Sequence, residues 1–509
     1  MRNIFELFIL SSFALLSGVT VHSLEANETG RYLISVDRTS SQQLMSLRQW
    51  FQVNREIQDG DRLILSVSMG ARELDFFRVK LPMATIEPDP KRYLLSQQPS
   101  LGAAKLSTWG REVIGLDGIS EDQIENQKLC IIDSGYSPLH HALYDELVSF
   151  TPHPNLQYDP MNDLCNHGTH VAGIVAAREQ PNGMRGVVSK GKLPLHIVQV
   201  FGESCRWIYA SDLMDAVQDC RAAGSTVVNM SLGGIHTSKI ERDFYEKLLN
   251  ENILLVAAAG NRGNTDKSYP ASYPAVMSVA AIDERLNRAS FSQRNKEVEI
   301  SAPGVAVWST VSGLTEVVVR SDAVEFSNLE AMTGSAYGQA HAVLVDGGRC
   351  LRTQRSWNSK IVLCERGGST FWEKLLNVQR SGALGVLVYN HEEGPFRGTL
   401  GAGNFSDIPI LSMSREQGKI LKDQHLGRFI ELSYFYDSTM GGFEAWDGTS
   451  MAAPHVAGVA ALVWSHAPHR SAKDLRKALC QGAKSLEDDF TGCGLVQARK
   501  ALEVLVELD

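Results

Sequence analysis

The sequence lacks several patterns that would assign it to a common class of protein. Its 509 residues include 49 Lys and Arg against 58 Asp and Glu, and this net charge of −9 leaves no basic excess for nucleic acid. It contains no C-x-x-C pair, so zinc-ribbon and thioredoxin patterns are excluded. It has no internal repeat, no low-complexity tract and, beyond its start, no apolar run long enough to span a bilayer. We therefore expect an ordinary globular chain of several domains without nucleic-acid or membrane partners.

The N-terminal stretch is the exception to this lack of apolar runs. Arg2 precedes an apolar segment from Leu7 to Leu16, and small residues follow at Val21 and Ser23. This order is typical of a cleaved signal peptide, which we place at residues 1–23. A membrane anchor is the alternative, but the apolar segment is short for a span. We therefore expect secretion to the extracellular space.

Eight cysteines in an exported chain predict disulfides. Closeness in sequence favours Cys205–Cys220, Cys350–Cys364 and Cys480–Cys493, which leaves Cys130 and Cys165 as a fourth pair or as two buried thiols. The sequon at Asn404 is the expected glycosylation site. A second sequon, at Asn229, lies on an expected buried strand and is rejected.

Apolar runs alternate with helical patterns over residues 105–312, which predicts a parallel sheet buried on both faces. The expected strands are 129–132, 196–200, 226–232, 253–259 and 276–281, and the expected helices are 167–178, 211–223 and 240–250. A second α/β pattern over 313–439 has strands at 342–345, 360–364 and 385–390 and a helix at 371–382. The first pattern returns over 440–509, so we expect one large α/β domain interrupted by a smaller inserted one.

The segment 24–104 precedes the first α/β pattern. It has strand-like patches at 31–37, 62–68 and 76–82. It ends in a stretch rich in Pro, Ser and Gly at 84–105, which is typical of a linker.

Polar residues stand where the expected strands end, and this is where open α/β sheets carry their functional groups. Asp133 follows one strand, Asn261 follows another, and His167 begins a helix. Two of these residues have an ordinary alternative. Asp133 could begin a turn, and His167 could be a helix-start histidine or a metal ligand paired with His170. The metal alternative lacks the Glu of H-E-x-x-H.

The stretch DGTSMAAPHVAGVAALVW, residues 447–464, predicts a buried helix with Ser450 at its first turn. Pro454 lies inside this pattern, although a proline in a helix interior costs about 3 kcal/mol. It cannot donate to the carbonyl of Ser450, four residues back, so it loosens only the first turn. There, unpaired N–H groups and the helix dipole favour developing negative charge.

Five motifs, IIDSG, HGTHVAG, NMSLGG, AAAGN and GTSMAAPHVAG, together resemble those of the subtilisin-like serine proteases, the subtilases. The order Asp, His, Ser is also the order of the triad in subtilisin. The resemblance covers about 105–312 and 438–500. The insert at 313–439 resembles a protease-associated (PA) domain, and ATIEPD at 84–89 resembles the end of a subtilase propeptide. The resemblance to the subtilases implies a three-layer subtilisin-like α/β fold with a mostly parallel sheet, an inserted PA domain and an N-terminal α+β propeptide.

The resemblance also implies residue roles. Ser450 matches the nucleophile, His167 the general base, Asp133 the carboxylate that orients it, and Asn261 the oxyanion-hole amide. The residues that match the two strands walling the substrate pocket are Ser231, Leu232, Gly233, Gly234, Ala258, Ala259 and Gly260. None of these carries a charge, so we expect a broad, apolar-leaning preference for the residue before the cut bond, P1.

Two positions differ from the family pattern for calcium. Ala142 stands where relatives often have a calcium-binding Asp, and the loop 178–183 is poor in suitable oxygen ligands. Structural calcium elsewhere stays an open alternative. The chemistry itself is expected to need no cofactor and no metal.

The resemblance implies a secreted serine endopeptidase made as a zymogen, acting on protein or peptide substrates and inhibited by its own propeptide. We expect a monomer that cuts itself between about Ser96 and Ser107. A catalytically dead scaffold that binds partners through the insert is the alternative. An α/β-hydrolase esterase is excluded, because Ser450 lies in GTSMA and not in G-x-S-x-G.

Overall fold

The computed structural model folds into two compact units, Met1–Pro88 and Asp89–Asp509, which are described separately. It describes residues 29–37, 40, 44–45, 51–95, 109–138, 140–143, 146–151, 161, 163, 165–202, 205, 207–322, 324–326, 329–332, 334–394, 396, 398–401, 404, 406–437 and 442–508. The expected signal peptide, residues 1–23, lies outside these residues.

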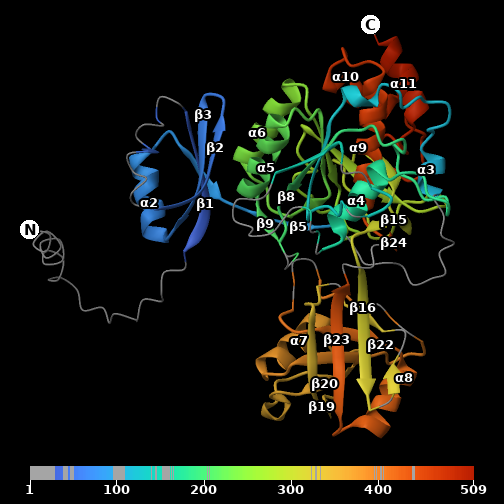
Figure 1. Cartoon of the computed structure of the whole chain (residues 1–509). Coiled ribbons are helices and arrows are strands. Elements are labelled where there is room, and N and C mark those ends of the chain that lie inside the picture. The colour runs from blue at the N-terminus through green and yellow to red at the C-terminus, as the bar shows by residue number, and fades with distance from the viewer. Residues whose placement is uncertain are drawn as a thin grey trace, which may run out of the picture. The chain divides into compact units, whose positions relative to one another are not determined.

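The N-terminal unit combines an antiparallel sheet with helix α2 (Ala71–Lys80) (Figure 1). The strand order is β2 (Gln52–Asp59), β3 (Arg62–Met69), β1 (Gly30–Asp37), β4 (Thr85–Pro88). Alternate residues of the sheet, such as Ile34 and Leu65, pack with Phe77 of α2 in one buried cluster. The unit is therefore α+β.

Two sequence-based expectations for the first hundred residues are wrong. Residues 76–82 were expected as a strand, but they lie mostly in α2, whose buried Leu74 and Phe77 have the three-residue spacing of one helix face. The stretch 84–105 was expected as a linker, but it begins with β4 and with β5 (Lys91–Leu94). Pairing with partner strands from elsewhere in the chain orders these residues, and local composition does not show it.

The second unit is built on a seven-stranded parallel sheet. Its strand order is β14 (Ile300–Pro303), β13 (Val276–Ile282), β12 (Leu254–Ala258), β10 (Val227–Met230), β6 (Leu129–Asp133), β8 (Leu195–Gln199), β7 (Val148–Thr151). The expected strands at 129–132, 196–200, 253–259 and 276–281 are confirmed within two residues. The expected strand at 226–232 is divided into β10 and β11 (Leu232–Gly233).

Helices cover both faces of this sheet (Figure 1). Helices α4 (His167–Ala176) and α9 (Thr449–Ser465) share a large core with one face, and α5 (Ala210–Ala222) and α6 (Lys239–Asn250) lie on the other. The remaining helical segments of this part are α3 (Trp109–Val113), η2 (Ile124–Asn126), α10 (Ala472–Gln481) and α11 (Ala498–Glu507). The three layers explain why the central strands are apolar without alternation.

The disulfides correct two of the expected pairings. Cys350–Cys364 and Cys480–Cys493 are confirmed, but the other bonds are Cys130–Cys220 and Cys165–Cys205, which replace the expected Cys205–Cys220 and Cys130–Cys165. Cys130 lies on β6 and Cys220 on α5, which packs on that strand. These two bonds join residues 90 and 40 positions apart, so closeness in sequence could not indicate them.

The insert begins and ends at one antiparallel pair of strands, β15 (Val307–Val311) and β24 (Gly442–Trp446). Val311 is opposite Gly442, so the chain leaves and returns at neighbouring points. An inserted domain therefore leaves the surrounding fold intact.

The insert has its own eight-stranded mixed sheet and its own buried clusters. The strand order is β17 (Val324–Phe326), β16 (Leu314–Ser321), β23 (Phe429–Asp437), β19 (Gly338–Asp346), β20 (Ile361–Glu365), β21 (Gly385–Tyr389), β22 (Ile410–Met413), β18 (Glu330–Ala331). Its helical segments are η3 (Arg355–Trp357), α7 (Phe371–Arg380), α8 (Arg415–Ile420) and η4 (Leu421–His425). The three strands and the helix expected here are confirmed.

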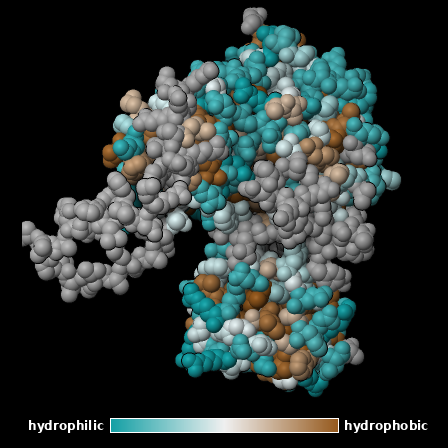
Figure 2. All heavy atoms as spheres, turned by 60° about the vertical axis from the view of Figure 1, so that its left-hand side comes forward, coloured by the Kyte–Doolittle hydropathy of each residue, from teal (hydrophilic) through white to brown (hydrophobic). Residues whose placement is uncertain are grey.

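Apolar residues are scattered among polar ones over the face shown in Figure 2, as on most soluble domains. Within the described ranges, no helix combines the length and the apolar character needed to cross a bilayer.

Candidate active site

Asp133 and His167 meet at the carboxyl edge of the central sheet. Asp133 ends β6 and His167 begins α4, and the Nδ1 of His167 lies 2.7 Å from the Oδ1 of Asp133, with both side chains buried. Gly168 makes this approach feasible, because a Cβ there would lie 2.2 Å from the carbonyl oxygen of Gly135. With Nδ1–H donating to the carboxylate, Nε2 keeps its lone pair. Within the described part of the chain this Nε2 has no hydrogen-bond partner.

A buried carboxylate that sequence reasoning missed, Asp163, holds the start of α4. Its Oδ2 accepts the backbone N–H of Thr169 at 2.7 Å, and its Oδ1 accepts the hydroxyl of Ser134 at 2.7 Å. The same hydroxyl oxygen accepts the N–H of Gly168 at 2.9 Å. Burial raises the pKa of Asp163, and the hydrogen bonds from Thr169 and Ser134 oppose that rise. No sequence motif marks this residue.

Ser450 lies in the first turn of α9 and forms a reciprocal pair of hydrogen bonds with Ser231. Its hydroxyl donates to the carbonyl of Ser231 at 2.9 Å, and the hydroxyl of Ser231 donates to the carbonyl of Ser450 at 2.8 Å. This second bond satisfies the carbonyl oxygen that Pro454 leaves without its helical donor. The sequence predicted that Pro454 loosens the first turn of this helix. It did not show that the hydroxyl of Ser231 replaces the missing donor.

Asn261 follows β12 and presents its amide N–H group in one fixed direction. Its Oδ1 accepts the backbone N–H of Thr449 at 3.0 Å and the hydroxyl of Thr449 at 2.7 Å. These two donors identify the oxygen of the amide, so Nδ2 is the atom that lies 2.5 Å from the carbonyl oxygen of Leu95. Thr449 is therefore a positioning residue, and sequence reasoning did not assign it this role.

Residues Lys91–Leu94 form the middle strand of a three-stranded sheet, β11–β5–β9, with β9 spanning Ile208–Tyr209. Leu94 pairs with Leu232 and Tyr93 with Gly233 in antiparallel register. The N–H of Leu95 lies 3.5 Å from the carbonyl oxygen of Ser231. An extended segment of the chain thus leads to Asn261 and ends with a carbonyl at its amide.

The residues predicted to wall the substrate pocket lie around this segment. Leu232 and Gly233 pair with it, and a Cβ on Gly233 would lie 2.9 Å from the side chain of Leu95. A Cβ on Gly234 would lie 2.3 Å from the carbonyl oxygen of Lys91. The other predicted residues lie at strand ends that meet at the same edge, namely Ser231 after β10, and Ala258, Ala259 and Gly260 at and after the end of β12. Ala258 belongs to the core against which Leu95 packs.

The contacts of His170 favour a structural role for this histidine. Its Nε2 lies 3.0 Å from the carbonyl oxygen of Glu444, and its ring stacks on Trp446. Over the described ranges, no three His, Cys, Asp or Glu side chains come together as a metal site. At the positions compared above with a calcium site, Ala142 is buried and its carbonyl accepts the N–H of Arg178 at 2.8 Å. A backbone hydrogen bond therefore joins Ala142 to the start of the loop 178–183.

Stability should fall in acid because of two buried histidines. Burial lowers the pKa of His170 to about 3 and that of His455 to about 4. Both stay neutral in the folded chain while the unfolded chain takes up a proton below its ordinary pKa of about 6.5. Their contribution is complete above that pH and is lost as the pH falls toward 4, at about 1.4 kcal/mol per pH unit for each histidine.

Denaturant unfolding between pH 7 and pH 4.5 measures this slope, and His455→Gln should make it shallower. An identical slope in the variant would contradict the prediction.

A family model described as the subtilase family matches residues 125–339 and 430–494, which together make up more than half of the chain. A model described as the PA domain matches residues 317–421. The interruption of the first match thus falls in the insert carried by β15 and β24.

Two curated relatives are similar to part of the chain. Subtilisin from Bacillus pumilus is 34% identical over 195 residues, which is 37% of this chain and 69% of the relative. Subtilisin amylosacchariticus from Bacillus subtilis subsp. amylosacchariticus is 32% identical over 238 residues, or 46% of this chain. The chain spans 59% of the length of that relative.

Two solved structures are similar in fold. The psychrophilic subtilisin-like protease Apa1 from Pseudoalteromonas sp. AS-11 has a TM-score of 0.51 at 34% identity, covering 77% of this chain and 96% of that one. Fervidolysin from Fervidobacterium pennivorans has a TM-score of 0.56 at 19% identity, covering 94% of this chain and 61% of that one. The second likeness concerns the fold alone.

Proposed function

The chain belongs to the subtilase family, and we propose that it is a serine endopeptidase that cuts peptide bonds through an acyl-enzyme on Ser450. The observation that supports this most is the hydrogen bond from the amide of Asn261 to the carbonyl of Leu95, because it holds a peptide carbonyl of an extended chain at the edge that also carries Ser450. A dead scaffold has less support, since Asp133, His167, Ser450 and Asn261 are all present.

In the proposed mechanism the hydroxyl of Ser450 attacks the carbonyl carbon of the scissile bond while Nε2 of His167 takes its proton. Asp133 holds the imidazole through Nδ1 and stabilises the imidazolium that forms. His167 then protonates the leaving amine, and a water molecule hydrolyses the acyl-enzyme by the same route. All groups that act belong to the protein, so no cofactor is required.

The serine hydroxyl must change partner to begin this reaction. It donates to Ser231 in the structure, whereas base catalysis needs it to donate to His167. Catalytic hydrogen bonds are often loose before a substrate is bound in a reactive pose. We propose that rotation of the Ser450 side chain forms the bond to Nε2 of His167.

Negative charge that develops on the carbonyl oxygen would be stabilised by Nδ2 of Asn261 and by the N–H of Ser450 at the start of α9. Because Thr449 fixes Oδ1 of Asn261, the donor needs no reorganisation when charge appears.

We propose that the chain is a zymogen whose N-terminal segment inhibits it. Lys91–Leu94 occupies the strand position where a substrate would pair, and its tether gives it a high effective concentration at the site. A parallel sheet requires distant pairings and folds slowly, which gives such a segment a second role in folding. The segment proposed as propeptide is 24–104, and the insert 313–439 is proposed not to supply catalytic groups.

The proposed P1 residue is apolar and of the size of leucine, because Leu95 packs against the main core and against Gly233.

Secretion as a monomer remains part of the proposal, supported by disulfides suited to an extracellular protein. Glycosylation at Asn404 is part of the proposal, and structural calcium stays an open alternative.

Self-cleavage should occur between Leu95 and Ser96. The expected interval, Ser96 to Ser107, lies outside the described residues, but the carbonyl bonded to Asn261 belongs to Leu95, one residue before that interval. N-terminal sequencing of the active protein, purified after expression in a host lacking other secreted proteases, should find a chain beginning at Ser96.

An active protein that still begins near Leu24 would contradict autocatalytic maturation.

The same preparation, given a peptide library, should prefer apolar P1 residues in a graded way, at about 1–3 kcal/mol per methylene. A strict requirement for Arg or Lys at P1 would contradict the proposed pocket.

A further inference from the structure

Residues 91–95 lie in the strand position proposed for a substrate. Their strand pairing therefore assigns each side chain to a position before the cut bond. If the scissile bond follows Leu95, as proposed above, Leu94, Tyr93 and Arg92 are P2, P3 and P4. Arg92 pairs with Ile208 of β9, while Tyr93 pairs with Gly233 of β11. The backbone pairs bind any extended sequence, so selection among substrates depends on the side chains at these positions.

The side chain of Arg92 is completely buried against Glu241, which is also completely buried. Its Nε donates to Oε1 of Glu241 at 3.3 Å, and its Nη2 donates to Oε2. Two parallel bonds between guanidinium and carboxylate form the strongest pairing geometry available to an arginine. The Nη1 donates to the carbonyl of Lys91 at 3.0 Å.

The surroundings of Glu241 are built for an ionised carboxylate. It is in the first turn of α6, where its backbone N–H donates to the hydroxyl of Ser238 at 3.0 Å and the helix dipole favours negative charge. Tyr273 donates its hydroxyl to Oε2 at 2.7 Å, and Tyr245 donates to Oε1 at 3.3 Å. Burial, together with the charge of Glu241, raises the pKa of both tyrosines, so they remain donors.

Arg92 supplies the only positive charge bonded to this carboxylate among the described residues. Two tyrosine hydroxyls alone leave the negative charge of Glu241 uncompensated once the segment departs. Removing one partner of a buried ion pair is strongly unfavourable, because the other charge stays buried without compensation. A substrate without a cation at P4 would bury Glu241 in that state, whereas a substrate with arginine would restore the pair.

We propose that Glu241 makes the P4 subsite selective for arginine, so that preferred substrates have the form Arg-X-X-Leu before the cut. This inference rests on the proposed endopeptidase function. Lysine should be a weaker substitute, because a single ammonium cannot form the two parallel bonds that a guanidinium makes. The segment proposed to inhibit the enzyme then has the same sequence pattern before the cut as the preferred substrates.

A set of quenched fluorescent peptides with the sequence RYLLSQQ, residues 92–98, tests the proposal on the mature wild-type protein. P4 is varied among Arg, Lys, citrulline and Ala. Citrulline keeps the shape of arginine and removes its charge. We expect kcat/KM for Arg to exceed that for citrulline and for Ala by roughly 10²-fold or more, as for truncation of a buried charge pair. Equal rates for all four peptides would overturn the proposal, whereas cleavage of none would contradict the endopeptidase function instead.

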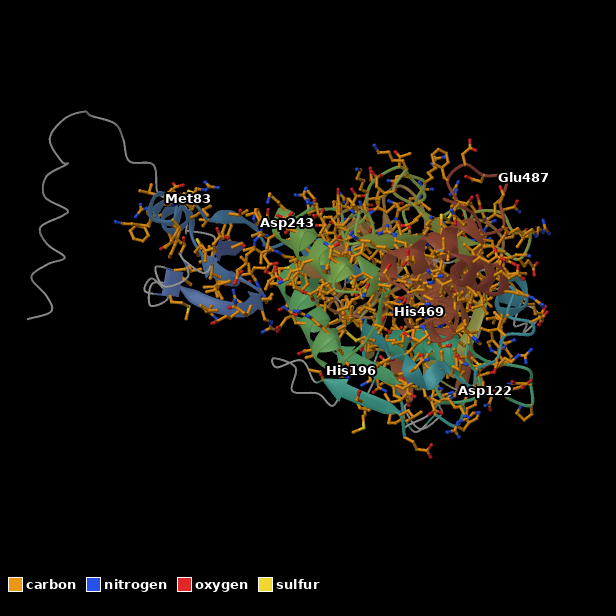
Figure 3. The ribbon with its side chains drawn as sticks, turned by 90° about the horizontal axis from the view of Figure 1, so that it is seen from above. Met83, Asp122, His196, Asp243, His469 and Glu487 are labelled. Carbon is orange, nitrogen blue, oxygen red and sulfur yellow. A yellow bond between two sulfur atoms is a disulfide. The ribbon has the colours of Figure 1, made fainter. Side chains whose placement is uncertain are left out.

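The variant Glu241→Gln should lose this selectivity and keep cleavage of the alanine peptide. Because it leaves Arg92 unpaired in the precursor, it is made together with Arg92→Gln. The control is Asp243→Asn on the same helix (Figure 3), since Asp243 pairs with Lys239 at 2.6 Å and with Arg242 at 2.9 Å, both on α6. Unchanged arginine selectivity in the paired variant would overturn the proposal. If that variant does not fold, the wild-type peptide set alone decides.

Discussion

Replacing Ser450 by alanine is expected to lower kcat by about 10⁶, the loss found when the triad serine of subtilisin itself is removed. The large effect follows from the loss of the covalent route, because without the hydroxyl only binding and the oxyanion hole remain. Peptide hydrolysis, labelling by a serine-directed phosphonate and self-cleavage should all be lost together. The precursor should accumulate with Leu95 still joined to Ser96.

The matched control for this variant is Ser465→Ala, at the other end of α9. Ser465 is buried like Ser450, and its hydroxyl donates to the carbonyl of Leu462 at 2.7 Å, far from the groups that act in the mechanism. It should keep both activity and labelling. If Ser450→Ala remains as active as the wild type, the mechanism assigned to the chain is wrong.

The second large effect is expected for Asn261→Ala, with kcat lower by about 10²–10³, a range that also comes from subtilisin. The amide donates to the carbonyl oxygen where charge develops, so its loss raises the barrier more than it weakens binding. KM should therefore change little. Thr449→Val should show a smaller loss in kcat, because it removes one of the two bonds that orient Asn261.

Asn264→Ala is the control for the amide variant. Asn264 is half-buried, and its Nδ2 donates to Asp266 at 2.8 Å. A rise in KM with unchanged kcat for Asn261→Ala would indicate ordinary substrate binding at this position and contradict an oxyanion role.

The sequence predicted the central strands well, because short buried strands leave strong local signals, and it placed the four candidate catalytic residues at or near the ends of these strands and at the start of two helices. The apolar runs at 129–132 and 253–259 end where the structure places β6 and β12. Asp133 and Asn261 follow directly at these ends, so strand limits sufficed to bring them to one edge.

What the sequence could not show are contacts between distant residues. Asp163 holds the start of α4 through hydrogen bonds to Thr169 and Ser134, and Thr449 orients Asn261 through another. The spacing of these residues in the sequence does not indicate either contact. The bond Cys130–Cys220 depends on how α5 packs on the sheet. The strand at 91–94 exists through pairing with residues more than a hundred positions away.

The three-stranded arrangement around β5 has a consequence for whole proteins as substrates. Departure of its middle strand leaves β11 and β9 separated by the width of a single extended chain, so on the proposed function a substrate must enter as a strand. A target sequence inside a helix or a packed sheet cannot do so until its surroundings open. The rate at which a native protein is cut should then follow the population of its locally opened states, and stabilising a target should protect it even where its sequence fits the site perfectly.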